Sequence, residues 1–421
     1  MKAGISPRVR GNFRCDLYAA VLFSGFNVVF NQFYVPIAIR AGATPLEVGL
    51  LTAAPAFGML FSPLWGRRIA GRDPKPFVIL PNLAGRSLVL LPALFGEPWA
   101  FIAASLAFHL LMGVQAPAYA ALMTRVYPGE VRGRLMGSVR VAMGLCMIPL
   151  SYAVGKWLDV AGPFWPLVAA ALFGVASSLA LLPLRPLESL PASGSPERPT
   201  NENRQEKGRS SLKGNRALAV FLIATSFAGF GNLIANPIYQ IIQVRHLGLT
   251  DSEIGTARTV YVACLLAAYL IGGRAIDQMP VRNVLSCGLL AYAVVPMMYA
   301  FVPHYGTVLV ASGVQGVGDA IWDIGILNYV FRIAPGREAA VFSLHLMLFG
   351  IRGSIAPFLS TGLVGVAPFS VILAAASLCG WIGAVLFFTA ESPLLRRSLR
   401  SLGRNLGRNA SECGGDRPWT T

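Results

Sequence analysis

The sequence is poor in charged residues and lacks the common signatures of nucleotide and metal chemistry. Charged residues make up 13% of the 421 positions, whereas soluble domains carry about 25%. The chain contains no G-x4-G-K-[ST] phosphate loop, no H-E-x-x-H motif and no C-x-x-C pair. We therefore expect no enzyme activity, no cofactor, no metal site and no ATP drive.

The cysteines are too scattered to indicate disulfides or a metal cluster. Most of them fall in apolar runs, where cysteine commonly serves as a small core residue. The six positions are Cys15, Cys146, Cys264, Cys287, Cys379 and Cys413.

Apolar residues dominate the composition. They make up 55% of the chain, and the mean hydropathy is +0.59, as in a protein that crosses a membrane many times. The net charge of +16 would suggest nucleic acid for a soluble protein. Here the basic residues fall in short loops and in both tails, so membrane topology explains them and no nucleic-acid partner is expected.

Twelve apolar runs are long enough to cross a bilayer, which needs about 20 helical residues. Helices are expected because an open sheet would leave its edge groups unpaired in lipid. The prediction is an all-α integral membrane protein with twelve transmembrane helices. The runs lie near 16–38, 46–65, 76–95, 98–123, 134–157, 163–183, 217–241, 252–273, 282–302, 305–331, 338–364 and 367–390.

One long polar segment, residues 184–216, divides the chain. Its Pro, Ser, Gly and charged residues cannot bury enough apolar surface to order it, so we predict a cytoplasmic linker. Residues 1–183 and 217–391 then form two bundles of six helices, and residues 392–421 form a basic tail.

The loops alternate in basic charge, which predicts their sides of the membrane. One set includes the linker, both termini and loops such as the one that carries Arg67 and Lys75. The other set holds only Arg40, Lys156 and Arg245. Basic loops face the cytoplasm, so we expect a cell membrane protein with cytoplasmic N- and C-termini.

The two halves repeat several short patterns in the same order. The first and seventh spans share N-x3-N-x2-Y, and the loops that follow read T-P-L-E-V-G and T-D-S-E-I-G. At this spacing the three side chains share one helix face. The repeat predicts two pseudo-symmetric bundles in parallel topology. The residues are Asn27, Asn31 and Tyr34, and Asn232, Asn236 and Tyr239.

These features resemble the major facilitator superfamily over nearly the whole chain. The family motif between the second and third helices is matched in part by Gly66 and Lys75 in the first half, where Ala70 replaces the usual acid. The second half matches with Gly273, Asp277 and Arg282. The resemblance implies that these residues belong to a cytoplasmic gate.

The resemblance also implies a carrier whose two bundles enclose a central cavity lined by helices 1, 4, 7 and 10. The repeated asparagines and tyrosines would then face the cavity and bind substrate. The alternative is that the asparagines form hydrogen bonds between helices.

A polar face in the tenth span is a candidate coupling site. Gln315, Asp319, Trp322 and Asp323 follow the spacing i, i+4, i+7 and i+8. An ionised carboxylate is costly in hydrocarbon and beside another acid. Asp319, and less clearly Asp323, therefore suit proton coupling, with Gln315 and Trp322 beside the substrate. The alternative is an ion pair between Asp319 and Arg352.

Several basic residues also fall inside predicted spans. Arg258 and Arg352 are candidates to hold an anionic group of the substrate. Arg86 and Arg140 suit structural roles, and His109 suits a satisfied core position.

The resulting prediction is a secondary active transporter of a small organic solute, with an anionic solute favoured, that works by alternating access and proton coupling. One alternative is an exporter of hydrophobic drugs, suggested by Phe26, Phe30, Phe33 and Trp322. Another is a non-transporting receptor or assembly protein with the same fold. The expected partners are the solute, protons and membrane lipids, and we expect a monomer.

Overall fold

The computed structural model describes residues 6–69, 71–187, 216–278, 281–333 and 338–389. Helices joined by short loops make up nearly all of these ranges. Most of the predicted linker and the predicted basic tail lie outside the described residues.

The first half contains six crossings. The first consists of α1, η1 and α2 in series, and the third of α4 and α5. The bounds are α1 Pro7–Asn27, η1 Val28–Phe33, α2 Tyr34–Arg40, α3 Pro45–Ile69, α4 Lys75–Ser87, α5 Leu90–Phe95, α6 Pro98–Val126, α7 Gly129–Ala161 and α8 Phe164–Leu179.

The second half contains six further crossings, of which α10 and η2 together make the first. All twelve lie close to the predicted spans, and nine of those in the described residues are long and apolar enough by themselves to span a bilayer. The bounds are α10 Arg216–Ile241, η2 Ile242–His246, α11 Asp251–Gln278, α12 Val281–Phe301, α13 Tyr305–Ile333, α14 Glu338–Gly362 and α15 Phe369–Thr389.

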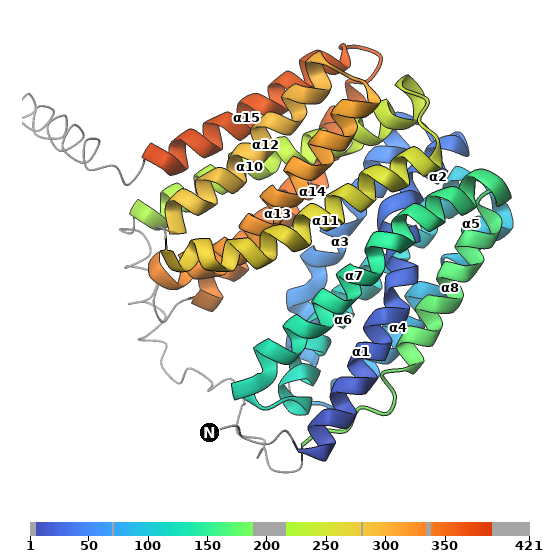
Figure 1. The fold of residues 1–421 in the computed structure, drawn as a ribbon, viewed down its shortest axis with the longest axis vertical. Helices are drawn as coiled ribbons and strands as arrows, with labels where there is room; N and C mark the ends of the chain where they lie inside the picture. Colours follow the sequence, from blue (N-terminus) through green and yellow to red (C-terminus); the bar gives the residue numbers. More distant parts are fainter. Residues whose placement is uncertain (1–5, 70, 188–215, 279–280, 334–337, 390–421) are drawn as a thin grey trace, which may run out of the picture.

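The helices form two bundles that meet along two seams (Figure 1). In one seam α7 packs against α11, and in the other α3 packs against α14. The bundles touch at the end that carries α2 and the start of α11, and they diverge toward the end at which α1 and α10 begin (Figure 1). We call these the closed end and the linker end.

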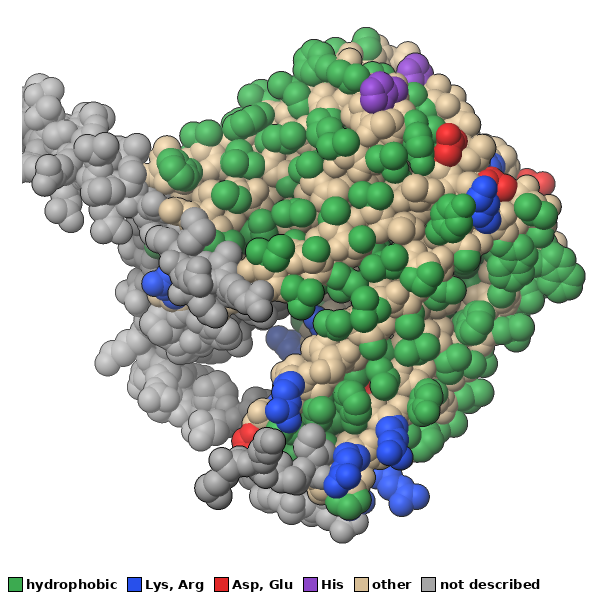
Figure 2. Space-filling view, in the orientation of Figure 1, with side chains coloured by type: hydrophobic (Ala, Val, Ile, Leu, Met, Phe, Trp, Pro, Cys, Tyr) green, Lys and Arg blue, Asp and Glu red, His purple; other side chains and the backbone are tan. Residues whose placement is uncertain are grey.

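The space-filling view shows the same asymmetry (Figure 2). A gap separates the two halves at the linker end, and apolar side chains cover the middle of the visible face. Lysine and arginine side chains gather on the lower bundle near the gap. The surface therefore combines a broad apolar band with a basic end, as expected for a protein that lies in a membrane.

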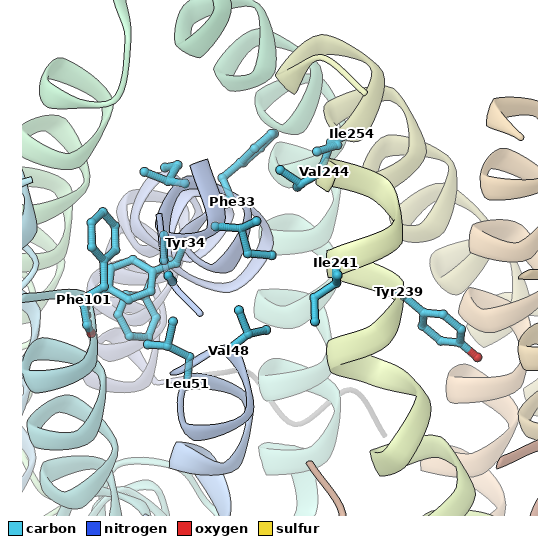
Figure 3. Packing of buried hydrophobic residues seen from close by; sticks show 14 of the residues in the cluster. Phe33, Tyr34, Val48, Leu51, Phe101, Tyr239, Ile241, Val244 and Ile254 are labelled. Atoms are coloured by element: carbon cyan, nitrogen blue, oxygen red, sulfur yellow. Dashed lines mark hydrogen bonds between the residues drawn. The ribbon is translucent and has the colours of Figure 1, made fainter. Parts of the chain in front are cut away.

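Buried apolar residues of both halves merge at the closed end. Phe33 and Val48 come from the first half and Val244 and Ile254 from the second, and all belong to one cluster (Figure 3). Burial of this shared core removes apolar surface from water. It therefore holds the halves together at this end.

A π-helical segment interrupts the first crossing. The wider turn of η1, Val28–Phe33, changes the rotation of the residues that follow it. Asn31 is exposed while Tyr34 is only 2% exposed. The equivalent residues Asn236 and Tyr239 show the same difference within the continuous helix α10. In both halves the asparagine and the tyrosine therefore have different surroundings.

Candidate functional site

The Asp319 carboxylate lies inside the second bundle, on α13. Tyr261 of α11 donates a hydrogen bond to Oδ2 at 2.9 Å, and Tyr292 of α12 donates one to Oδ1 at 2.8 Å. No lysine or arginine pairs with this carboxylate within the described residues. A carboxylate at membrane depth without a cation favours its protonated form, while the two hydroxyl donors offset part of the cost of ionisation. The group can therefore exist with or without a proton.

The other polar residues of α13 lie in different surroundings. Asp323 is exposed, and the Tyr269 hydroxyl donates to its Oδ2 at 2.6 Å. The Trp322 ring lies 5.7 Å from the ring of His345, between centroids. Gln315 is partly exposed and shows no hydrogen bond within the described part of the chain. Among these four residues of α13, Asp319 alone combines partial burial with two side-chain donors.

The Arg258 guanidinium has the surroundings expected of a group that binds a ligand. It is partly buried on α11, near the hydroxyl groups of Tyr261 and Tyr299. Within the described residues it forms no hydrogen bond and no ion pair. Tyr261 follows Arg258 by about one helical turn and donates to Asp319, so it is a neighbour of both groups.

Arg352 has a different environment. It is 8% exposed on α14, and its guanidinium donates to the Thr225 carbonyl of α10. A Cβ added at Gly229 would lie 2.9 Å from its Nη1 atom, so glycine makes room for it. Arg352 therefore joins α14 to α10 and forms no ion pair with Asp319.

The repeated asparagines and tyrosines separate in the structure. Asn31 donates to the Asn27 side chain at 3.0 Å, and Asn31 and Asn236 are exposed. Tyr34 donates to the Phe101 carbonyl at 2.9 Å. The buried ring of Tyr239 stacks on Tyr299 with centroids 4.4 Å apart. Asn232 is partly exposed. The asparagines are thus at least partly exposed, whereas the tyrosines pack inside their bundles.

The predicted gate residues lie at the linker end. Lys75 donates to the Leu184 carbonyl at 3.1 Å, and Gly66 faces Pro117 of α6. Gly273 and Asp277 belong to α11 and Arg282 to α12, but their side chains lie outside the described part. The gate role remains a prediction.

Two of the remaining intramembrane groups have packing roles. Arg86 is buried and donates to the Gly174 carbonyl at 3.3 Å and to two serine hydroxyls of α8. Its guanidinium also lies 4.4 Å from the Phe23 ring centroid. His109 Nδ1 pairs with the Ser105 carbonyl oxygen at 2.8 Å.

Two arginines at the closed end bridge the halves in a symmetric manner. Arg40 Nη2 donates to the Leu249 carbonyl at 2.7 Å, and Arg245 Nη2 donates to the Ala43 carbonyl. Both donors and both acceptors occupy corresponding positions of the internal repeat. Each half therefore places one arginine on the backbone of the other.

Charged contacts that reach across the α7/α11 seam strengthen this end. Arg40 Nη2 lies 3.1 Å from Asp251 Oδ1. The Asp159 carboxylate of α7 accepts the backbone N–H groups of Asp251 at 2.8 Å and Ser252 at 2.9 Å, which begin α11. A carboxylate at a helix N-terminus is favoured by the helix dipole and by unpaired amides. We call Arg40, Asp159 and Asp251 the closed-end latch.

Sequence reasoning missed the latch and the tyrosines around Asp319. Arg40 and Arg245 were visible only as sparse loop charges, although their recurrence in the repeat was a usable signal. Tyr261 and Tyr292 carry no distinctive spacing relative to Asp319. Their convergence depends on the packing of three helices.

The twelve helices, the two bundles and a buried polar cluster define a multi-pass membrane transporter. The profile of the Major Facilitator Superfamily matches residues 17–231 and 221–412. The chain belongs to the Major Facilitator Superfamily. The predicted fold class and the absence of an enzymatic role are thereby confirmed.

One individual protein resembles part of the chain in sequence. A puromycin resistance protein, pur8 of Streptomyces alboniger, is 25% identical over 150 residues, which cover 35% of this chain and 29% of that protein. The match thus spans less than a third of that relative's length.

Two solved structures share the fold. A mutant of the nucleoside transporter NupG superposes with a TM-score of 0.73 at 12% identity, over 91% of this chain and all of that one. A bacterial homolog of the human lysosomal transporter Spinster, in an inward-facing, unoccupied conformation, gives 0.66 at 14% identity, over 92% and 98%.

Proposed function

We propose that this transporter moves a small organic solute with an anionic group and couples that movement to protons. The observation that carries the proposal is the Asp319 carboxylate, which lies at membrane depth with two tyrosine donors and, within the described residues, no ion-paired cation. An isolated carboxylate is expensive to hold ionised in a low-dielectric site. Binding of a proton removes that cost, and release of the proton brings it back during the transport cycle.

Arg258 supplies the binding group for the anion in this proposal. It carries a charge without a hydrogen bond in the described residues, so a carboxylate or phosphate of the solute would gain strong charge-assisted hydrogen bonds there. Asn31 and Asn236, both exposed, supply further polar contacts. Arg352 is already engaged with Thr225, so we assign it to packing.

Alternating access is the proposed mechanism. The halves meet at the closed end and part at the linker end (Figure 1), which gives one of the two states that a rocking carrier needs. We propose that the linker end faces the cytoplasm of a plasma membrane. Opening the other side would break the closed-end latch.

Export of a hydrophobic drug is the second candidate, because the relative that matches in sequence is named for puromycin resistance. Nucleosides join the candidates because one structural neighbour is named as a nucleoside transporter. Both classes are included in the test beside the anions.

Ligand binding is tested by thermal unfolding of the purified chain with organic anions, sugars, amino acids, nucleosides and puromycin. A ligand of the folded state raises the unfolding temperature by mass action. An anion should stabilise the parent and Arg352→Gln, each relative to its own ligand-free sample, but not Arg258→Gln. Stabilisation by puromycin alone, retained in Arg258→Gln, would overturn the anion assignment and favour the drug exporter.

Proton coupling is tested in proteoliposomes with the ligand so identified. An imposed pH gradient should drive its accumulation, and Asp319→Asn should abolish this while equilibrative exchange continues. Asp323→Asn is the matched control, because that side chain is exposed on the same helix. Gradient-driven accumulation by Asp319→Asn would refute the coupling role.

A further inference from the structure

A groove lies between α3 and α6 on the linker side of their crossing. The backbones touch there: a Cβ added at Gly113 would lie 2.3 Å from the Gly58 carbonyl oxygen. Beyond this point larger side chains line a cavity of about 570 Å³, within the range of about 300–1,000 Å³ typical of ligand sites. Its walls include Phe61, Leu64, Trp65, Arg68, Leu110 and Val114.

The α6 wall of the groove faces away from the centre of the bundle. Phe108 and His109 of α6 contact the Phe30 ring of α1. Successive residues of an α-helix are about 100° apart, so Leu110 and Val114 point to the opposite side of α6. Leu110 is 43% exposed although apolar. Such a face lies against lipid.

The α3 wall lies on the same side. Its Leu60 packs against Gly350 of α14, whereas Phe61 and Leu64 are 47% and 59% exposed. The groove therefore opens beside the seam toward the hydrocarbon, apart from the Asp319 cluster in the other half.

One cation marks the linker end of this apolar groove. The Arg68 guanidinium lies 5.8 Å from the Trp65 ring centroid, one residue before α3 ends at Ile69. It forms no ion pair within the described residues. Tryptophan and arginine at a helix end are typical of the headgroup region. The groove thus offers apolar walls for a chain and a positive charge where a phosphate would lie.

We propose that this groove binds an anionic phospholipid of the linker-side leaflet. One acyl chain lies along Phe61, Leu64 and Leu110, and the phosphate and its anionic headgroup lie at Arg68. The aromatic ring of Trp65 fixes the guanidinium in place. A bound lipid fills the space that the Gly58–Gly113 crossing leaves and supports the packing of α3 against α6.

The test is native mass spectrometry of the full chain in detergent, titrated with phosphatidylglycerol or phosphatidylcholine. The parent should bind phosphatidylglycerol more tightly. Arg68→Gln should lose about five-fold in phosphatidylglycerol affinity, the effect of one basic side chain near an anionic surface, and Arg68→Lys should retain most of it. Leu110→Trp should weaken both lipids by filling the groove.

Arg67→Gln is the matched control, because Arg67 is exposed next to Arg68 but does not line the groove. It should bind phosphatidylglycerol as the parent does. Equal losses in the two glutamine variants would show a diffuse basic surface and overturn the site. Equal affinity of the parent for both lipids, or no effect of Leu110→Trp, would also overturn it.

Discussion

Removal of Asp159 should open the closed end. The Asp159→Ala variant takes away the carboxylate that accepts the first amides of α11 from the other half. Loss of an N-cap acceptor costs about 1 kcal/mol. Asp159 also accepts a hydrogen bond from the Ser252 hydroxyl, and a net hydrogen bond contributes about 0.5–1.5 kcal/mol.

These contributions act only on the closed state, since they join the two halves. A change of about 1.4 kcal/mol shifts an equilibrium about ten-fold. We therefore expect the population that is open at this end to rise about ten-fold in Asp159→Ala. Arg40→Gln should give at least as large a rise, because it removes the bonds to Leu249 and Asp251 and leaves the Asp251 carboxylate without its cation. The double variant should be less than additive because both residues contact Asp251.

The assay is the labelling rate of a cysteine at position 259 in a chain whose six natural cysteines are replaced. Thr259 donates to the Ile148 carbonyl across the seam at 3.1 Å, so a membrane-impermeant maleimide reaches it from the closed side only after opening. Labelling of the Thr259→Cys chain should become about ten-fold faster with Asp159→Ala, by the population shift above.

Glu253→Ala is the matched control for this experiment. Glu253 accepts the Thr250 N–H at 2.8 Å within its own half, so its loss weakens the same helix start without touching the seam. The free energy of unfolding should fall, while the cysteine at position 259 is labelled at the same rate as in the parent. Equal acceleration in Asp159→Ala and Glu253→Ala would refute the latch, because general fraying of α11 would then explain both.

Three further changes test the packing. Gly255→Ala should accelerate labelling of the cysteine at position 259, because the added Cβ would lie 2.5 Å from the Ser151 carbonyl oxygen across the seam. An unchanged labelling rate would contradict this close contact. Arg352→Gln should lower the free energy of unfolding by about 1–3 kcal/mol through its lost bond to Thr225, measured by denaturant titration, with ligand affinity unchanged. Tyr34→Phe should lower the free energy of unfolding by about 1 kcal/mol in the same titration, again without loss of transport. A changed KM for the solute would show instead that Tyr34 contacts the substrate.

The span positions were predictable because the membrane imposes length and polarity on every helix. Residues 252–273, for instance, had to form one apolar segment between a sparsely charged loop and a basic loop, and α11 covers them. The repeat likewise marked Asn27 and Asn232 as equivalent. Charges inside spans, such as Asp319, were visible because hydrocarbon makes them rare.

The candidate site was only partly predictable. Asp319 and Arg258 stood out by charge, but their common neighbour Tyr261 did not. Arg352 satisfied the same sequence criterion as Arg258, yet its guanidinium reaches the Thr225 carbonyl. Whether a buried arginine joins helices or meets a ligand depends on which helix lies opposite it.

The sequence by itself determined the twelve helices, their division into two halves and the residues whose charge is unusual in lipid. These follow from local hydropathy and from repetition along the chain. The tertiary structure alone decided the bond of Tyr34 to the Phe101 carbonyl, the tyrosine pair on Asp319 and the contact of Asp159 with α11. The reason is physical: each of these joins groups from separate helices, and hydropathy carries no information about which helices meet.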